Sequence, residues 1–277
     1  MKKLMFMLLI WGSIQGVYAQ RTEKSKKFMV DKTLFEELTD VKKKSDKFNL
    51  YLNMQGGFDA NFRDGFEEGA FKMRQLRIEM KGNINNWLSY RYRQRLNRSN
   101  DGGGMIDNVP TSIDYAGIGI KLNDRFNLFA GKQCTAYGGI EFDLNPIDIY
   151  EYSDMIENMS NFMTGLNIGY NLTSTQQLNL QILNSRNGSF DSTYGITENE
   201  EGKLPDLKSG KLPLVYTLNW NGNFNNMFKT RWSTSIMNEA KNHNMYYYAI
   251  GNELNLGKWN AFVDFMYSKE DIDRKGI

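Results

Sequence analysis

The chain has few of the residues from which catalytic and metal sites are usually built. Its 277 residues include one cysteine and one histidine. A single cysteine cannot form an internal disulfide, and one histidine with one cysteine falls short of the usual ligand set of a zinc site. We therefore expect no disulfide framework, no metal site, no cofactor and no enzymatic activity.

Long apolar runs are missing after the N-terminus. The mean hydropathy is −0.57, whereas a membrane-spanning helix needs about 20 predominantly apolar residues. The first segment, MKKLMFMLLIWGSIQGVYAQ, has a basic start, an apolar stretch over residues 4–11 and a small-residue site at 17–19. This pattern is typical of a secretory signal peptide, residues 1–19, cleaved after Ala19. The alternative is a buried N-terminal helix.

The chain also has no large excess of basic over acidic residues or of acidic over basic ones. The chain has 34 basic and 32 acidic residues, and removal of Lys2 and Lys3 with the signal peptide leaves 32 of each. A neutral protein has no electrostatic reason to bind nucleic acid. The highly charged residues 20–46 include a helix-like piece, TLFEELTDVKKK. We predict a periplasmic N-terminal segment there; a disordered tail is the alternative.

From residue 47 onward, apolar and polar residues alternate. In LRIEMK, for example, Leu76, Ile78 and Met80 alternate with charged residues. A period of two is typical of β-strands. The pattern predicts about eleven strands, at 47–54, 76–81, 88–98, 115–122, 125–131, 162–172, 176–183, 212–221, 228–236, 246–256 and 258–268.

The connections between these strands alternate in length. One set is short, with sequences such as GNINN, NDR and NLTST. The other set is mostly long, at 98–111, 134–160 and 186–211, with shorter members at 64–69 and 238–244. Such strands, with turns at one end and loops at the other, are typical of an outer-membrane β-barrel. A soluble β-sandwich also alternates, but its connections need not sort by length. We predict an all-β, antiparallel transmembrane barrel domain over residues 47–277.

The segment LSYRYRQRLNR, residues 88–98, defines the two faces of such a barrel. Arg91, Arg93 and Arg95 share one face of the strand, whereas Tyr90 and Tyr92 share the other. An arginine on the lipid face near mid-bilayer costs about 2–4 kcal/mol, so the arginines must face inward. The tyrosines and residues such as Ile118 and Ile120 then face lipid. A wet barrel interior forms a channel or a ligand cavity.

Three segments carry a resemblance to a known family. FKMRQLRIEMKGNINNWLSYRYRQRLN, LFAGKQ and GGIEFDLNPIDIYEYSDMIENMSNFMTGLNIGY resemble the phosphate-selective porin O/P family, in the branch found in Bacteroidetes. The resemblance covers residues 47–268. It implies a trimeric barrel of about 16 strands with one loop folded into the pore.

The chain departs from this family pattern in two ways. Eleven is an odd number of strands, whereas single-chain bacterial barrels have even numbers. The chain also ends in KEDIDRKGI, whereas family members end on a strand with a terminal aromatic residue. We therefore expect a C-terminally incomplete barrel, from either a truncated gene product or a partial sequence.

Charge is segregated along the barrel region. Eight basic residues lie between Phe71 and Arg98, with Glu79 as the only acid, whereas residues 133–185 contain no lysine or arginine. We predict that one wall of the pore is basic, with Arg77, Lys81, Arg91, Arg93 and Arg95. We predict an acidic constriction loop opposite, with Glu141, Asp143, Asp148, Glu151, Asp154 and Glu157. Charged walls are how pores select ions.

The acidic loop is the third connection on the long side, and we expect residues 134–160 to fold inward with a short helix around 148–159. Its apolar residues Ile149, Tyr152 and Ile156 need a wall on which to pack. Two alternatives remain for the charges. They could form merely solvated surfaces, or the loop carboxylates could bind Ca²⁺, although their spacing matches no EF-hand.

Nominal catalytic motifs are weak. AGKQ lacks the upstream glycine and the following Ser or Thr of a P-loop. A barrel lipase would pair a serine such as Ser233 or Ser235 with His243, but this histidine is predicted to lie in an external loop. Cys134 is predicted to be a buried small residue.

These patterns favour an outer-membrane porin, a passive diffusion channel for small hydrophilic solutes with a preference for anions or phosphate. The expected partners are outer-membrane lipid, small anions or other hydrophilic solutes, and two further copies in a homotrimer. One alternative is a barrel that forms no channel and acts as an adhesin or an enzyme. Another is a non-functional truncated porin.

Overall fold

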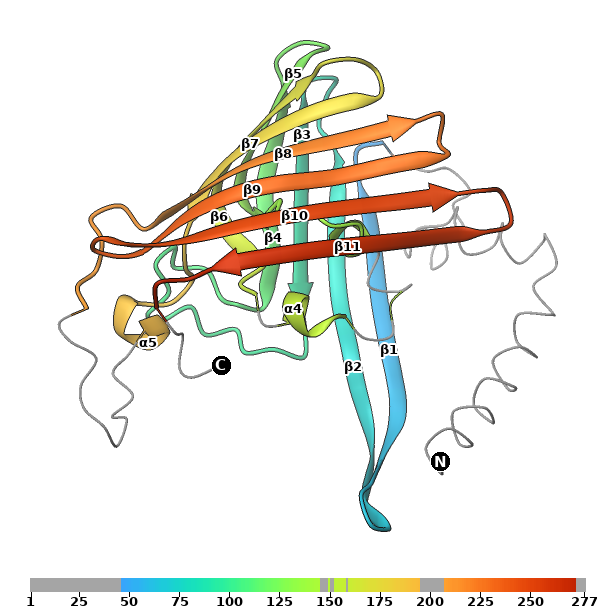
Figure 1. The fold of residues 1–277 in the computed structure, drawn as a ribbon, viewed down its shortest axis with the longest axis vertical. Coiled ribbons are helices and arrows are strands. Elements are labelled where there is room, and N and C mark those ends of the chain that lie inside the picture. The colour runs from blue at the N-terminus through green and yellow to red at the C-terminus, as the bar shows by residue number, and fades with distance from the viewer. Residues whose placement is uncertain (1–45, 145–148, 150–151, 158, 195–206, 273–277) are drawn as a thin grey trace.

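Eleven antiparallel strands form one sheet in which each strand pairs with the next one along the chain (Figure 1). The computed structural model describes residues 46–144, 149, 152–157, 159–194 and 207–272. The predicted signal peptide, residues 20–45 and two acidic loop residues, Asp148 and Glu151, lie outside the described residues. The eleven predicted strands are confirmed.

The strands differ in length. They are β1 (Asn49–Phe62), β2 (Phe66–Asn83), β3 (Leu88–Arg95), β4 (Ile113–Lys121), β5 (Phe126–Cys134), β6 (Phe162–Asn171), β7 (Gln176–Asn184), β8 (Leu214–Phe224), β9 (Phe228–Ala240), β10 (His243–Asn255) and β11 (Asn260–Lys269). Three short helices are described: η1 (Glu141–Asp143), α4 (Asp154–Glu157) and α5 (Phe190–Tyr194). None of the described helices has the length and apolarity needed to cross a membrane. Among the described residues β1 and β11 do not pair, so the sheet is open.

The first hairpin is longer than the sequence pattern predicted. The expected connection at 64–69 is wrong, because β1 runs to Phe62 and β2 already begins at Phe66. Strand β2 pairs with β3 only over 77–83, so residues 55–75 form a two-stranded ribbon that projects beyond the sheet (Figure 1). Aromatic rings pack across the ribbon, with Phe58 opposite Phe71. Such cross-strand pairs stabilise extended hairpins.

The expected connection at 238–244 is also too long. Strand β9 continues to Ala240 and β10 starts at His243, so only two residues form the turn. Asn242 has φ 66°, a left-handed conformation that asparagine tolerates in tight turns. His243 therefore belongs to a strand and not to an external loop.

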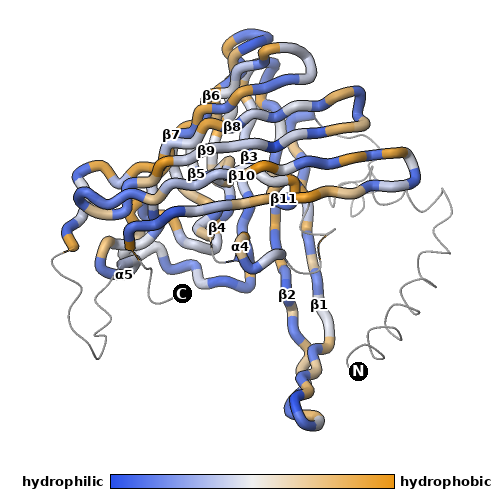
Figure 2. Tube along the Cα trace, in the orientation of Figure 1, coloured by the Kyte–Doolittle hydropathy of each residue, from blue (hydrophilic) through white to orange (hydrophobic). Residues whose placement is uncertain are grey.

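The two faces of the sheet have opposite chemistry, as predicted. Ile118, Leu218 and Ile250 are exposed on the outer face, whereas Thr217 and Asn219 are buried on the inner face. The hydropathy colours accordingly alternate along the strands in Figure 2. Near the short turns, aromatic pairs line the outer face, such as the Trp220 and Trp232 rings, whose centroids are 5.2 Å apart. Aromatic girdles of this kind mark membrane interfaces.

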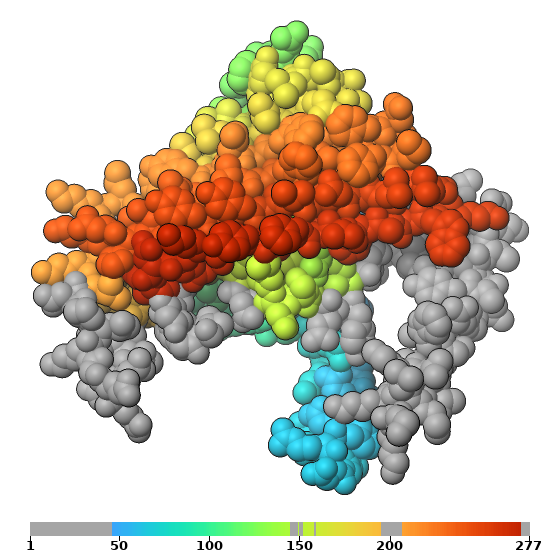
Figure 3. Space-filling model, viewed as in Figure 1, coloured from blue at the N-terminus to red at the C-terminus, as the bar shows by residue number. Residues whose placement is uncertain are grey.

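The inner face also carries one apolar core. It joins Tyr137 of the β5–β6 connection to residues of β6–β10, namely Met163, Leu183, Val215, Met237, Met245, Tyr247 and Ala249. The Tyr137 and Tyr247 rings lie 5.1 Å apart. This connection, yellow-green in Figure 3, emerges beneath the edge of the sheet. The core therefore holds the connection on the concave side.

Candidate functional site

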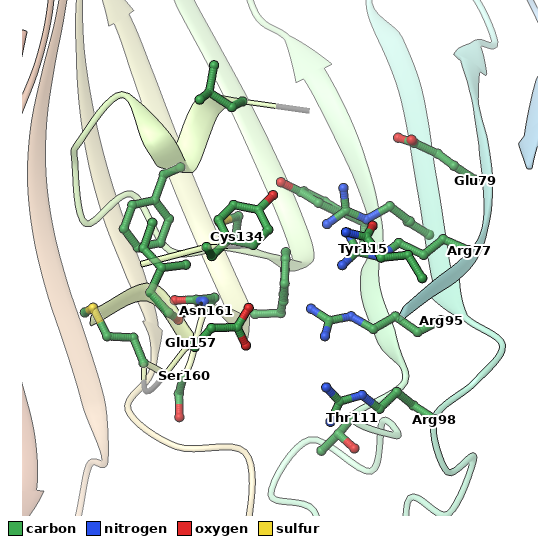
Figure 4. Close-up of a pocket in the computed structure, with 18 of the residues that line it drawn as sticks. Arg77, Glu79, Arg95, Arg98, Thr111, Tyr115, Cys134, Glu157, Ser160 and Asn161 are labelled. Atoms are coloured by element: carbon green, nitrogen blue, oxygen red, sulfur yellow. Dashed lines mark hydrogen bonds between the residues drawn. The ribbon is translucent and has the colours of Figure 1, made fainter. Parts of the chain in front are cut away.

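A cavity of about 960 Å³ separates the inner face of β1–β5 from the β5–β6 connection. Eight basic residues line it: Arg74, Arg77, Lys81, Arg91, Arg93, Arg95, Arg98 and Lys132. The acidic lining residues are Asp59, Glu79, Asp143 and Glu157. In Figure 4, Arg95 and Arg98 project from one side towards Glu157 and Ser160 on the other. The five basic residues named from the sequence thus line one cavity.

Four arginines form a wall on β2 and β3, which we call the arginine wall: Arg77, Arg91, Arg93 and Arg95. Arg77 stands directly opposite Arg95 in the sheet, and Lys81 directly opposite Arg91. Like charges in opposite positions destabilise a sheet. The wall therefore needs counter-charges within it.

Asp114 supplies the larger part of this counter-charge. Its carboxylate is 0 % exposed and accepts hydrogen bonds from Nε of Arg93 at 3.0 Å and Nε of Arg95 at 2.9 Å. A terminal nitrogen of Arg77 lies 4.0 Å from the same carboxylate. One buried acid therefore holds Arg93 and Arg95 in fixed positions and lies within ion-pair distance of Arg77.

A β-bulge brings Asp114 to the inner side. Strict alternation would place this residue on the outer face with Ala116 and Ile118. The register shifts instead between Arg93 and Gln94, which pair with Tyr115 and Ile113, so that Asp114 is the extra residue. Bulges of this kind re-aim a side chain. The alternation pattern did not predict Asp114 at this site, although an acid on a lipid-facing row was a signal that alternation fails there.

Arg91 and Lys81 have different partners. Nε of Arg91 donates to Glu79 at 2.8 Å, and its guanidinium lies 3.7 Å from the centre of the Tyr115 ring. The ammonium of Lys81 lies 4.9 Å from the centre of the Tyr51 ring. Ring faces attract cations at such distances. These contacts keep both charges at the cavity while limiting their rotation.

A buried ion pair fixes the β3–β4 connection beside the arginine wall. The ammonium of Lys132 lies 3.5 Å from Asp107, whose carboxylate also accepts a hydrogen bond from Thr164 at 2.5 Å. Gly131 has φ 125°, and a Cβ there would lie 2.2 Å from the carbonyl oxygen of Ala116. Only glycine fits this approach, at the point where the strand turns Lys132 inward. Neither member of the pair was predicted from the sequence.

The β5–β6 connection folds inward, as predicted. The backbone amides of Ile140 and Glu141 donate to Asp264 on β11 at 2.8 and 2.9 Å. Tyr152 and Ile156 line the cavity opposite the arginines. The described helix is shorter than the predicted 148–159 segment, because α4 spans only Asp154–Glu157.

The acidic residues of this connection have separate roles. Asp143 forms an ion pair with Arg231 on β9, and Glu157 faces the cavity. Glu141 instead accepts hydrogen bonds from the backbone and the hydroxyl of Ser153, at 2.7 and 2.8 Å. Glu141 and Asp154 are not among the described lining residues. The predicted acidic face is therefore reduced, within the described residues, to Asp143 and Glu157.

A second, smaller cavity lies beside the first. Its volume is about 310 Å³, and it shares five lining residues with the larger cavity: Arg91, Tyr115, Cys134, Phe142 and Asp143. Its remaining polar lining is mostly asparagine and glutamine from β6–β8. Cys134 is only partly buried and lines both cavities, so it is not a packed core residue.

The described part of the chain gives no support to the calcium and lipase alternatives. In that part, no three residues among His, Cys, Asp and Glu are placed to hold a metal ion. His243 pairs with Ala240, whereas Ser235 pairs with Tyr247, so the two are four positions apart along the sheet. Four positions correspond to about 13 Å, far beyond a hydrogen bond.

A solved structure of an outer-membrane channel shares this arrangement of strands. The outer-membrane channel DcaP of Acinetobacter baumannii aligns with a TM-score of 0.50 at 12% identity, covering 82% of this chain and 65% of its own. OmpF of Salmonella typhi, in a complex with daunomycin, aligns with a TM-score of 0.47 at 15% identity, covering 81% and 67%. This chain thus spans about two thirds of their length. No curated protein sequence matches it.

The family model described as phosphate-selective porin O and P matches residues 48–277. The match includes every described strand, the arginine wall, Asp114 and the inward-folded connection. The chain therefore belongs to the phosphate-selective porin O and P family.

Proposed function

We propose that this protein is an outer-membrane porin, a passive diffusion channel that prefers anions. The observation that carries the proposal is the lining of the larger cavity, where eight basic residues outnumber four acidic ones. A water-filled passage with such walls concentrates anions and repels cations. The family name supports phosphate as one of its solutes.

The preference is moderate rather than absolute. Asp114 and Glu79 neutralise two charges within the wall itself, and Asp143 is paired with Arg231. Guanidinium groups that already bind a carboxylate attract a passing anion less strongly than free ones. We infer that small anions pass without tight binding at any one arginine, a condition for rapid conduction.

The proposed location and assembly follow from the same membership. The basic, apolar and small-residue pattern of residues 1–19 directs export, and the apolar outer face of the strands lies in the outer membrane. We propose a homotrimer, as the resemblance implies. Band positions of unheated and heated samples on a denaturing gel test this assembly, because an intact trimer migrates far above a monomer.

The decisive experiment is electrical. The full-length protein, purified from outer membranes, is inserted into planar bilayers, and the reversal potential is measured in a tenfold gradient of potassium chloride. In an anion-preferring pore, the reversal potential has the sign of the chloride equilibrium potential, which we call the sign set by chloride. Its magnitude cannot exceed about 59 mV, the value for a pore that passes only chloride. The absence of conductance, or a potential of the sign set by potassium, would refute the proposal.

A further inference from the structure

The smaller cavity has a wall of neutral side chains, which we call the carboxamide wall. Six residues from β6, β7 and β8 form it: Asn167, Gln177, Asn179, Gln181, Asn219 and Asn221. Each carboxamide offers two donors and one acceptor oxygen without a net charge. Such a wall attracts neither ion type but can bind hydroxyl groups.

The bonds within the carboxamide wall are long. The amide of Asn179 donates to Gln177 at 3.2 Å and to Asn219 at 3.4 Å, and Asn167 donates to Asn179 at 3.3 Å. The usual N–H···O distance is about 2.9–3.0 Å. These side chains therefore bind one another weakly, whereas Gln181 and Gln177 have shorter bonds to groups outside the wall, with the amide of Ala136 at 2.6 Å and with Asn171 at 2.9 Å. A solute hydroxyl could replace such contacts with shorter ones at little loss.

Aromatic rings complete the lining. Tyr115, Phe129 and Phe142 line the smaller cavity together with the carboxamides. A polyol has hydroxyl groups that need donors and acceptors and C–H faces that pack on rings. The volume of about 310 Å³ lies at the lower end of the range of ligand pockets, roughly 300–1,000 Å³.

The two cavities meet at a charged group. Arg91 and Tyr115 line both, and the other charged lining residues of the smaller cavity, Asp143 and Arg231, form an ion pair with each other. A molecule that bridges the cavities would place an anionic group at the arginine wall and an uncharged part at the carboxamide wall. Inorganic phosphate has no uncharged part, so it would contact only the arginine wall.

We propose that the carboxamide wall is a subsite for the polyol part of an anionic sugar, of the sugar-phosphate class. The phosphate group lies at Arg91 and its neighbours, and the sugar hydroxyls lie against the carboxamide wall. This inference rests on the proposed anion-preferring pore and adds a substrate class to it. It predicts that a sugar phosphate binds more tightly in the pore than inorganic phosphate of the same charge.

The test compares two probes, glucose 6-phosphate and inorganic phosphate, in alkaline buffer, where both carry two negative charges. It measures their block of the chloride current of the full-length protein in planar bilayers. The test variant replaces Gln177 and Asn221, which stand opposite each other on β7 and β8, with leucine. The matched control replaces Gln55 and Gln75, an opposite pair on β1 and β2 that lines only the larger cavity.

In the unmodified protein, we expect glucose 6-phosphate to block at a concentration about tenfold lower than phosphate, as two ordinary hydrogen bonds would give. The Gln177→Leu, Asn221→Leu variant should lose most of this difference and keep the phosphate value and the reversal potential. The Gln55→Leu, Gln75→Leu control should keep the difference.

Equal block by the two probes, or a difference that survives in the Gln177→Leu, Asn221→Leu variant, would overturn the inference. Either result would leave the proposed function standing if the reversal potential still has the sign set by chloride. A cation-type reversal potential in the unmodified protein would instead overturn the proposed function. The two failures are therefore distinguishable in one set of recordings.

Discussion

The arginine wall and the carboxamide wall occupy the inner face of the same antiparallel sheet but are stabilised differently. In the arginine wall, Asp114 is fully buried and bonded to Arg93 and Arg95 at 2.9–3.0 Å. In the carboxamide wall, Asn179 is bonded to its neighbours at 3.2–3.4 Å. Removal of one partner from a buried charge network costs about 3–5 kcal/mol, whereas one neutral hydrogen bond contributes about 0.5–1.5 kcal/mol.

Under the proposed function, this difference separates the tasks of the two walls. Charges that are paired and buried cannot rearrange, so the arginine wall presents a fixed field to a passing ion. Neutral groups with long mutual bonds can exchange partners, so the carboxamide wall can adapt to different hydroxyl patterns. The first wall should determine charge preference, and the second should discriminate among solutes of equal charge.

The largest expected effect is on stability. Asp114→Ala leaves Arg77, Arg93 and Arg95 close together without their shared acid, and we expect a loss of about 3–5 kcal/mol in unfolding free energy. Asn179→Leu in the carboxamide wall should cost about 1 kcal/mol. Urea unfolding of the protein in lipid vesicles measures both. Equal costs would contradict the proposed difference between the walls.

The next effect is on ion preference. Replacement of Arg91, Arg93 and Arg95 with glutamine should move selectivity towards cations, because the lining then keeps five basic residues against four acidic ones instead of eight against four. Asp114→Asn must be added, since the acid would otherwise stay buried without its closest partners. We expect the reversal potential in a tenfold gradient to move by more than about half of the 59 mV limit. An unmoved potential would mean that the arginine row is only a solvated surface.

A smaller effect concerns Cys134, the single cysteine of the chain, which lines both cavities. Anionic thiosulfonate reagents should modify it about tenfold faster than cationic ones of similar size, since basic walls raise the local concentration of anions. The decline of single-channel current during exposure to each reagent gives the two rates. Cys134→Ser should abolish both declines. Equal rates would argue against a net positive field at the junction of the cavities.

The smallest effect concerns the inward connection. Asp264→Ala removes the acceptor of the Ile140 and Glu141 amides. Packing of Tyr137 on Tyr247 remains, so the connection should loosen at one end without leaving the lumen. We expect a small rise in conductance with unchanged ion preference, because both walls are intact. Asp264→Asn, which keeps one acceptor oxygen, should show less change.

Much of the fold could be predicted from the sequence because its cause is local. A side chain alternates faces at every position of a strand, and lipid penalises charge on one face. This rule alone identified eleven strands, placed Arg91, Arg93 and Arg95 on the inner face and sent Ile118 outward. The inward path of the β5–β6 connection followed from its length and its apolar residues.

The rule failed where pairing departs from strict alternation. Asp114 belongs by pattern to the outer row of Ile118, and only the bulge opposite Arg93 turns it inward. By alternation, Lys132 also belongs to the outward-facing row of its strand, but the backbone at Gly131 turns it inward. Gly131 has φ 125°, a conformation that the hydrophobicity pattern does not predict. The turn at Asn242 and the long ribbon of β1 and β2 also depend on register and not on composition.

The sequence by itself determined the strand order, the two faces of the sheet and the presence of a basic wall, because each of these depends on a residue's own chemistry and its position within one strand. The tertiary structure alone decided which acid neutralises that wall, where the connection is anchored and how the lumen divides into two cavities. These outcomes depend on contacts between distant segments, such as Ile140 with Asp264. The alternation of residues within one strand carries no information about the register between strands. These contacts therefore could not be predicted from any single strand.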